Sequence, residues 1–231
     1  MAAGIAQEIQ KVYTLVDKAV KNIAKKNSQI TLKELKELPL NKAYKILMGN
    51  LRFGYVDMRE RREFQHYYAS SISSGTPSTA KVLRLSQELA DLSSSLPCED
   101  TNSIFVRCDK ERIDVVKIMV MGSRDTPYSN GAFVFDMYCD DSYPNNPPKM
   151  SLTTTGGGKI RFNPNLYSCG KVCLSLLGTW RGQASENWDA KLSTLLQLFI
   201  STQGITMSED VYFNEPGFDS EQGTPEGEKK N

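Results

Sequence analysis

The sequence has little of what several large functional classes require. It contains one histidine, His66, among 231 residues, so a histidine-rich zinc site is excluded and a cysteine–histidine catalytic pair has only this imidazole to use. Its 28 basic and 27 acidic residues give a net charge of +1, which provides no overall attraction for nucleic acid. We therefore expect no nucleic-acid partner and no histidine-based metal site.

Long apolar runs are also missing. No stretch approaches the roughly 18 apolar residues that a membrane-spanning helix needs. The first residues, MAAGIAQEIQKVY, carry acid and glutamine where a signal peptide has an apolar centre. We expect no membrane association and a protein of the cytoplasm or nucleus, where thiols stay reduced.

Cysteines are present in a pattern that does not suggest disulfides or metal. The five are odd in number and mostly far apart. Cys169 and Cys173 lack the second pair of a zinc site and are one residue too far apart for the usual redox motif. The other three are expected to be small buried apolar side chains: Cys98, Cys108 and Cys139. No metal is predicted.

The stretch GGGK at residues 156–159 resembles the end of a phosphate-binding loop. The glycine needed five positions before Gly158 is Thr153, and Ile160 stands where serine or threonine would bind magnesium. We interpret this stretch as a flexible hairpin, so neither nucleotide hydrolysis nor a bound cofactor is expected.

Apolar periodicity predicts helices in the first part of the chain. Residues 5–24 form one apolar helix face, and Thr31 to Glu34 form a capping box for a short helix stopped by Pro39. We divide the chain into four parts by composition: a helical N-terminal region (1–69), a polar linker (70–79), a core (80–216) and a polar tail expected to be disordered (217–231).

The core begins with an amphipathic helical pattern at residues 82–92. Short connections between the extended runs that follow predict a four-stranded antiparallel meander, over residues 103–108, 113–122, 131–139 and 149–154. A later helix, predicted at 190–202, has an apolar face formed by Leu192, Leu195, Leu196, Phe199 and Ile200. This order predicts an α+β fold with helices packed on one sheet.

A nucleophilic cysteine in this chain would need a reaction that requires little help from a base, because His66 is distant in sequence. Exchange between a thiol and a thioester meets that condition, since the attacking and leaving groups have similar pKa values.

Two stretches carry a family resemblance. GSRDTPYSNGAFVFDMYCDDSYPNNPPKMSL has a Thr-Pro-Tyr turn and a Tyr-Pro-x-x-Pro-Pro segment, and RFNPNLYSCGKVCLSLLGTW has Asn-Pro-Asn followed by Gly-x-x-Cys-Leu. Together they resemble the core of a ubiquitin-conjugating enzyme, over about residues 80–215. The asparagine at 163, where the family usually has histidine, CLSLLGTW and YFNEPGF are most similar to the conjugating domains of very large, BRUCE-like members.

The resemblance implies a function. Cys173 would accept ubiquitin as a thioester from a ubiquitin-activating enzyme, which uses ATP at that earlier step, and would transfer it to lysines of substrate proteins. A ubiquitin ligase is a possible further partner. Asn165 would donate a hydrogen bond to the oxyanion, and Asn163 would support the loop. Glu215, aligned on the proline of Asn-Glu-Pro, is the candidate for the family's acid near the thioester.

The resemblance also places the two tryptophans. Trp188 matches the family's tryptophan before the following helix better than Trp180 does. Residues 181–187 are then an insertion, expected to be a solvent-facing loop that could shape access of the acceptor lysine. Trp180 is expected to be a packing residue.

Two alternatives stay open at this point. One is a weak or inactive adaptor of the same fold that binds ubiquitin or a partner enzyme. The other is a structural domain that belongs to a much larger protein. The cysteine, asparagine and glycine of the motif favour the enzyme, because inactive variants typically lose the cysteine.

Overall fold

The computed structural model describes residues 31–58, 65–72, 76–214 and 217–230. By internal contacts the chain divides into two compact units, one with residues 31–51 and 98–100 and the other with the described residues of 52–97 and 101–230. The helix predicted at 5–24 lies outside the described residues. No helix in the described ranges is long and apolar enough to cross a bilayer.

The smaller unit contains two short helices, α2 (Leu32–Glu37) and α3 (Leu40–Met48), and the 3₁₀ turn η1 (Gly49–Leu51). The capping box predicted from sequence is confirmed: Thr31 accepts a hydrogen bond from the backbone of Glu34, whose side chain accepts one from the backbone of Thr31. The helix ends before Pro39, because proline cannot donate the next backbone hydrogen bond.

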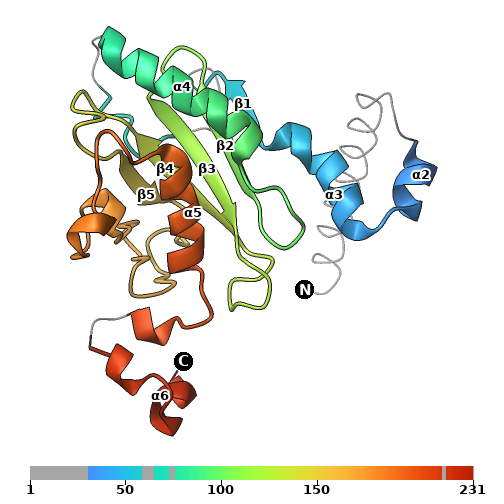
Figure 1. The fold of residues 1–231 in the computed structure, drawn as a ribbon, viewed down its shortest axis with the longest axis vertical. Coiled ribbons are helices and arrows are strands. Elements are labelled where there is room, and N and C mark those ends of the chain that lie inside the picture. Colours follow the sequence, from blue (N-terminus) through green and yellow to red (C-terminus); the bar gives the residue numbers. More distant parts are fainter. Residues whose placement is uncertain (1–30, 59–64, 73–75, 215–216, 231) are drawn as a thin grey trace. The chain divides into compact units, whose positions relative to one another are not determined.

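The larger unit is built on a sheet in the order β1-β2-β3-β4-β5 (Figure 1). The predicted antiparallel meander is confirmed by four of its strands: β2 (Ile104–Asp109), β3 (Val115–Met121), β4 (Ala132–Tyr138) and β5 (Lys149–Leu152). The fifth strand, β1 (Phe53–Val56), pairs in parallel with β2 and makes the sheet mixed. Three of its residues are half-buried and Tyr55 is 50% exposed, so this short strand lacks the alternation of buried and exposed side chains from which a strand is predicted.

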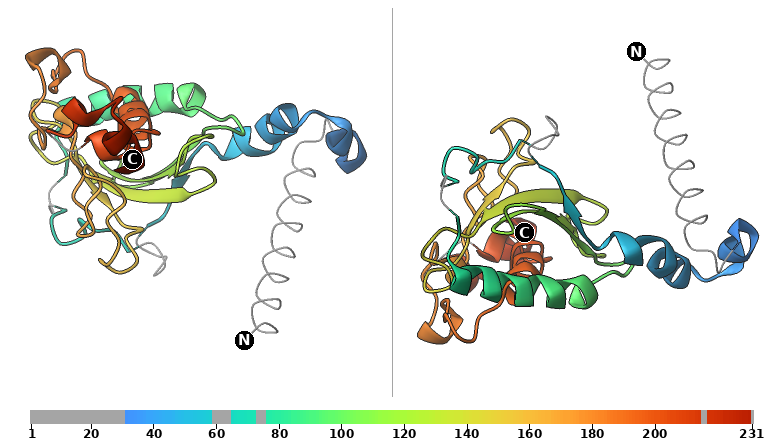
Figure 2. Two further views of the ribbon diagram at one scale, coloured as in Figure 1. Left: turned by 90° about the horizontal axis from the view of Figure 1, so that it is seen from below. Right: turned by 90° about the horizontal axis from the view of Figure 1, so that it is seen from above.

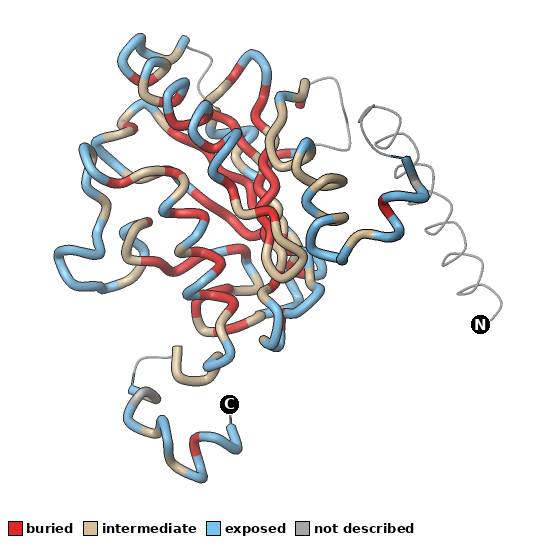
Figure 3. The backbone as a smooth tube through the Cα atoms, turned by 45° about the vertical axis from the view of Figure 1, so that its right-hand side comes forward, coloured by how far each residue is buried: buried red, intermediate tan, exposed pale blue. Residues whose placement is uncertain are grey.

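Two helices cover one face of this sheet, α4 (Thr79–Ser95) and α5 (Leu195–Thr206) (Figure 2). Ser78 caps α4 by accepting a hydrogen bond from the backbone of Lys81. The apolar face of α4 (Leu85, Leu89 and Leu92) meets alternate residues of the strands in one buried core. Those strand residues include Val106, Ile118, Phe135 and Met137. The core appears as the buried centre of Figure 3.

Residues 65–72, here called the outer-face segment, lie against the other face of the sheet. Asp136, completely buried on β4, accepts hydrogen bonds from the backbone of Tyr67 (2.7 Å) and from Nζ of Lys117 (2.5 Å). Lys117 also donates to the carbonyl of Gln65. The backbone of the outer-face segment is therefore hydrogen-bonded to both partners of a shielded ion pair within the sheet.

The helix after the cysteine motif differs from the prediction. It begins at Leu195, because Thr194 and Gln197 form a capping box and the preceding turn is closed by Asp189. Two members of the predicted apolar face point outward: Leu192, before the helix, is 76% exposed, and Ile200 is 46% exposed. Leu198 and Thr202 are buried instead.

The polar tail also differs from its composition. Between residues 217 and 230 the chain forms the 3₁₀ turn η5 (Asp219–Glu221) and the helix α6 (Pro225–Lys230). The ring of Phe218 stacks on Tyr212 with centroids 4.5 Å apart, and Lys230 pairs with Glu221 at 2.7 Å. Aromatic stacking and an ion pair thus add order that the composition does not indicate.

Candidate active site around Cys173

The loop that carries Cys173 is fixed by reciprocal hydrogen bonds with Asn165. The backbone N–H of Cys173 donates to the carbonyl of Asn165, and Nδ2 of Asn165 donates to the carbonyl of Cys173, both at 2.9 Å. Both residues are buried, with exposed fractions of 2% and 4% respectively. The two residues singled out from the sequence are thus brought together.

Asn163 holds the other side of this loop. Its Oδ1 accepts hydrogen bonds from the backbone N–H groups of Asn165 and Leu166, each at 2.7 Å. Its Nδ2 donates to the carbonyl of Thr206, at the end of α5. These contacts use both ends of the amide to connect the loop to the helix, so Asn163 supports the loop, as predicted.

The backbone conformation and the close contacts at position 170 explain why the Gly-x-x-Cys motif has glycine there. Gly170 has φ +89°, and a Cβ there would lie 2.6 Å from Oγ of Ser151 and 2.7 Å from the carbonyl oxygen of Leu152. Its own carbonyl accepts the backbone N–H of Leu152 at 2.8 Å. Any other residue would push the loop away from β5 and displace the residues leading to Cys173.

Thr179 fixes the peptide groups on either side of Cys173. The hydroxyl of Thr179 accepts the backbone N–H of Leu174 at 3.0 Å and donates to the carbonyl of Val172 at 2.7 Å. No sequence pattern indicated these hydrogen bonds. The 3₁₀ turn η2 (Ser175–Leu177) follows Leu174 and ends at Gly178, which has φ 64°. The backbone around Cys173 is therefore bonded on both sides.

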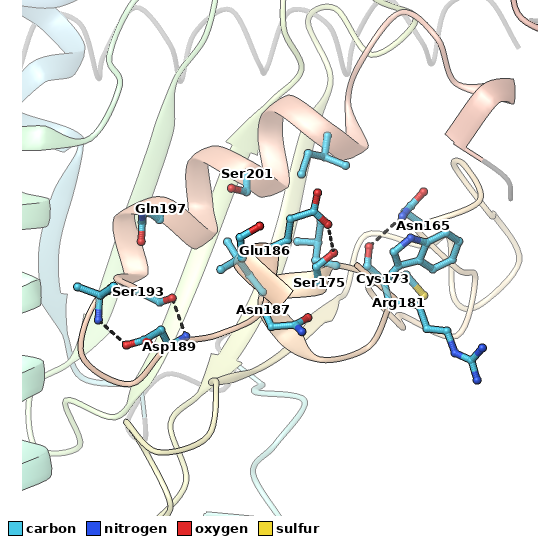
Figure 4. Close-up of a pocket in the computed structure, with 16 residues that line it drawn as sticks. Asn165, Cys173, Ser175, Arg181, Glu186, Asn187, Asp189, Ser193, Gln197 and Ser201 are labelled. Atoms are coloured by element: carbon cyan, nitrogen blue, oxygen red, sulfur yellow. Dashed lines mark hydrogen bonds between the residues drawn. The ribbon is translucent and has the colours of Figure 1, made fainter. Parts of the chain in front are cut away.

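Cys173 lines a groove of about 620 Å³ that runs along α5 (Figure 4). The groove is lined by the loop that carries Cys173, by the insertion at 181–187 and by residues at the start and on the outer side of α5. Its lining includes Asn165, Ser175, Trp180, Glu186, Asp189 and Ser201.

The remaining cysteines do not line this groove. Cys98, Cys108 and Cys139 are buried, as predicted. Burial raises the pKa of Cys108 to about 12, and burial also raises the pKa of Cys139 well above its ordinary value, so both are thiols at neutral pH. Cys169 is exposed. Among the described cysteines, only Cys173 combines burial with access to the groove.

Trp188 and Trp180 lie in different environments. Trp188 packs against the core, donates from Nε1 to the carbonyl of Pro144 at 2.7 Å and lies 5.7 Å from the ring of Tyr143. Trp180 is half-buried and lines the groove, so it is placed for contact with a ligand and not in the core as expected. The candidate acid Glu215 lies outside the described residues, and its role stays a prediction.

The GGGK stretch forms a tight turn after β5. Gly156, Gly157 and Gly158 all have positive φ, and the backbone N–H groups of Lys159 and Ile160 donate to the carbonyl of Thr155. The glycines are required by this turn geometry. None of these residues lines the groove of Cys173.

The sheet covered by helices on one face (Figure 2), and the cysteine and asparagine joined at a groove, are the features that the resemblance to ubiquitin-conjugating enzymes implied. Residues 84–212 match the family described as ubiquitin-conjugating enzyme, and the chain belongs to that family. The fold and the resemblance predicted from sequence are confirmed.

The chain is also similar to individual members of this family. The chain is 38% identical, over 96% of its length, to mouse and human proteins named dual E2 ubiquitin-conjugating enzyme/E3 ubiquitin-protein ligase BIRC6. It is also 47% identical, over 64% of its length, to the probable ubiquitin-conjugating enzyme protein 17 of Caenorhabditis elegans. The chain spans only 5% of the BIRC6 proteins and 20% of the nematode protein. These matches agree with the BRUCE-like branch inferred from sequence.

Proposed function

We propose that this chain is a ubiquitin-conjugating enzyme that carries ubiquitin as a thioester on Cys173 and transfers it to lysines of substrate proteins. The observation that carries the proposal is the pairing of Cys173 with Asn165 at the groove, inside the region that matches the family. Ubiquitin and an activating enzyme are the partners of this reaction, and a ligase is a further candidate partner.

In the loading step, ubiquitin passes from the thiol of the activating enzyme to the thiol of Cys173. The thiol of Cys173 loses its proton and its sulfur attacks the carbonyl carbon of the glycyl thioester held by the activating enzyme. A new C–S bond forms, the old C–S bond breaks, and the activating enzyme's thiolate leaves and takes up a proton. Because both sulfur groups have similar basicity, the step needs little help from a general base. This agrees with a groove whose described lining contains no histidine.

Transfer of ubiquitin from Cys173 to the acceptor lysine forms an amide bond. The acceptor lysine, after losing one proton from its ammonium group, attacks the thioester carbonyl, and negative charge develops on the carbonyl oxygen. Nδ2 of Asn165 has one N–H on the carbonyl of Cys173 and a second N–H available for that oxyanion. The C–S bond then breaks, the sulfur leaves as thiolate, and the remaining ammonium proton is lost to solvent or to that thiolate.

A charging assay tests the proposal. The chain is incubated with activating enzyme, ATP and ubiquitin and separated on non-reducing gels. We expect a thiol-sensitive adduct that Cys173→Ala abolishes and that the matched variant Cys169→Ala, at an exposed cysteine in the same loop, retains. A folded chain that forms no adduct would instead support the adaptor alternative.

A further inference from the structure

The insertion at 181–187 is attached to the loop of the nucleophile. At Gly182 the backbone approaches so closely that a Cβ would overlap Oγ of Ser175 and Oε2 of Glu186. Oε2 of Glu186 accepts the backbone N–H of Gln183 at 3.0 Å and the hydroxyl of Ser175 at 3.4 Å. The insertion is therefore exposed, as expected of a solvent-facing loop, and is also hydrogen-bonded to Ser175, two residues beyond Cys173.

This docking places the carboxylate of Glu186 on the lining of the groove. Figure 4 shows Glu186 facing Ser175, while Arg181 extends away from that carboxylate. Both hydrogen bonds to Glu186 use Oε2, which leaves Oε1 for a ligand. Asp189 also lines the groove, but its Oδ1 accepts two backbone N–H groups, those of Lys191 and Leu192.

A second observation comes from Asn165, beside the nucleophile. Oδ1 of this residue has no hydrogen-bond partner among the described residues, although the side chain is 4% exposed and lines the groove. Buried amide oxygens are nearly always paired, and only an N–H or O–H group can satisfy this one. The residue beside Cys173 thus carries a buried amide oxygen without a hydrogen-bond partner among the described residues, and the insertion carries a carboxylate on the groove lining.

We propose that Glu186 is a positioning residue that holds the ammonium group of the acceptor lysine in the groove, from which the deprotonated amine attacks the thioester beside Asn165. The inference rests on the proposed function and deepens it. Attraction between an ammonium and an exposed carboxylate increases occupancy of the groove without lowering the barrier of the chemical step. The carboxylate of Glu186 therefore lowers the acceptor concentration at which the discharge rate is half-maximal, and it does not change the rate at saturation.

The test uses the full chain preloaded with ubiquitin, with further charging stopped. Discharge is followed with two nucleophiles: Nα-acetyl-lysine amide, whose only amine is the ε-amine, and hydroxylamine, which is uncharged at neutral pH. In Glu186→Gln we expect the half-saturating concentration of the lysine compound to rise about three- to fivefold, the size of one solvent-exposed ion pair. The rate at saturation and the reaction with hydroxylamine should stay as in the unmodified chain.

Two further variants complete the test. Glu186→Lys reverses the charge and should raise the half-saturating concentration further, again without affecting hydroxylamine. Asp91→Asn removes one exposed negative charge from α4, none of whose residues lines the groove, and should change neither reaction.

Equal slowing with both nucleophiles, a Glu186→Gln variant that does not charge, or an unchanged dependence on the lysine compound would each overturn the inference. Failure of the unmodified chain to form a thioester would instead refute the proposed function. The two failures are therefore distinguishable.

Discussion

Replacing Asn165 with alanine separates two roles that this side chain can have. In the resting structure the change removes one neutral hydrogen bond, from Nδ2 to the carbonyl of Cys173, worth about 1 kcal/mol. It also removes the unpaired Oδ1, which partly offsets that loss. The backbone bond from Cys173 to the carbonyl of residue 165 is kept, so we expect the free energy of unfolding to fall by at most about 1 kcal/mol.

The effect on transfer is expected to be much larger. One preorganised oxyanion donor is worth about 2.7–4 kcal/mol, or roughly a hundred- to a thousandfold in rate. The assay charges the Asn165→Ala variant, stops charging and follows discharge to free lysine in a single turnover. Charging should proceed as in the unmodified chain, because thiol exchange is the easier step.

Thr179→Val is the matched control for this measurement. It removes the hydrogen bonds that fix the peptide groups beside Cys173, a structural loss at least as large as that of Asn165→Ala, but it removes no donor to the thioester. We expect its discharge rate to stay within a few-fold of the unmodified chain. Discharge of Asn165→Ala at the unmodified rate, or equal slowing in Thr179→Val, would refute the oxyanion role.

Two further predictions concern the scaffold. Glu88 is buried and accepts hydrogen bonds from Tyr143, Arg84 and the backbone of Leu195, so Glu88→Ala should lower the free energy of unfolding by about 3–5 kcal/mol in urea titrations; a loss under 1 kcal/mol would contradict this. Burial alone would raise the pKa of Asp114, but hydrogen bonds from Arg112 and Lys81 hold it below its ordinary value. The stability from this carboxylate is therefore complete above the unfolded-state pKa of about 3.9 and is lost as pH falls through the folded value, and Asp114→Asn should weaken the acid dependence of urea unfolding.

The sequence was sufficient to predict the features that depend on residues close together in the chain. Extended runs and short connections predicted the strands of the meander, and the family resemblance carried by the Asn-Pro-Asn and Gly-x-x-Cys motifs predicted that Asn165 and Cys173 belong to one site. The capping box at Thr31 also needs only four consecutive residues. Each of these features is decided by neighbours in the chain.

The features that were missed depend on distant contacts. The strand β1 is defined by its pairing with β2, about 50 positions later, and no turn sequence indicates that pairing. The docking of the insertion depends on the close approach of Gly182 to Ser175, which neither segment indicates alone. The inward face of α5 was misassigned because Leu192 continues the apolar spacing but precedes the capping box at Thr194.

The strand β1 and the outer-face segment together have a consequence for self-association. Without β1, one edge of β2 would present unpaired backbone N–H and C=O groups, and such an edge is a template for strands of other molecules. Without the outer-face segment, the buried ion pair on β4 and the neighbouring Val115 and Tyr138 would face solvent. A chain shortened to begin at α4 is therefore expected to form oligomers or aggregates, while one that begins before β1 keeps both protections.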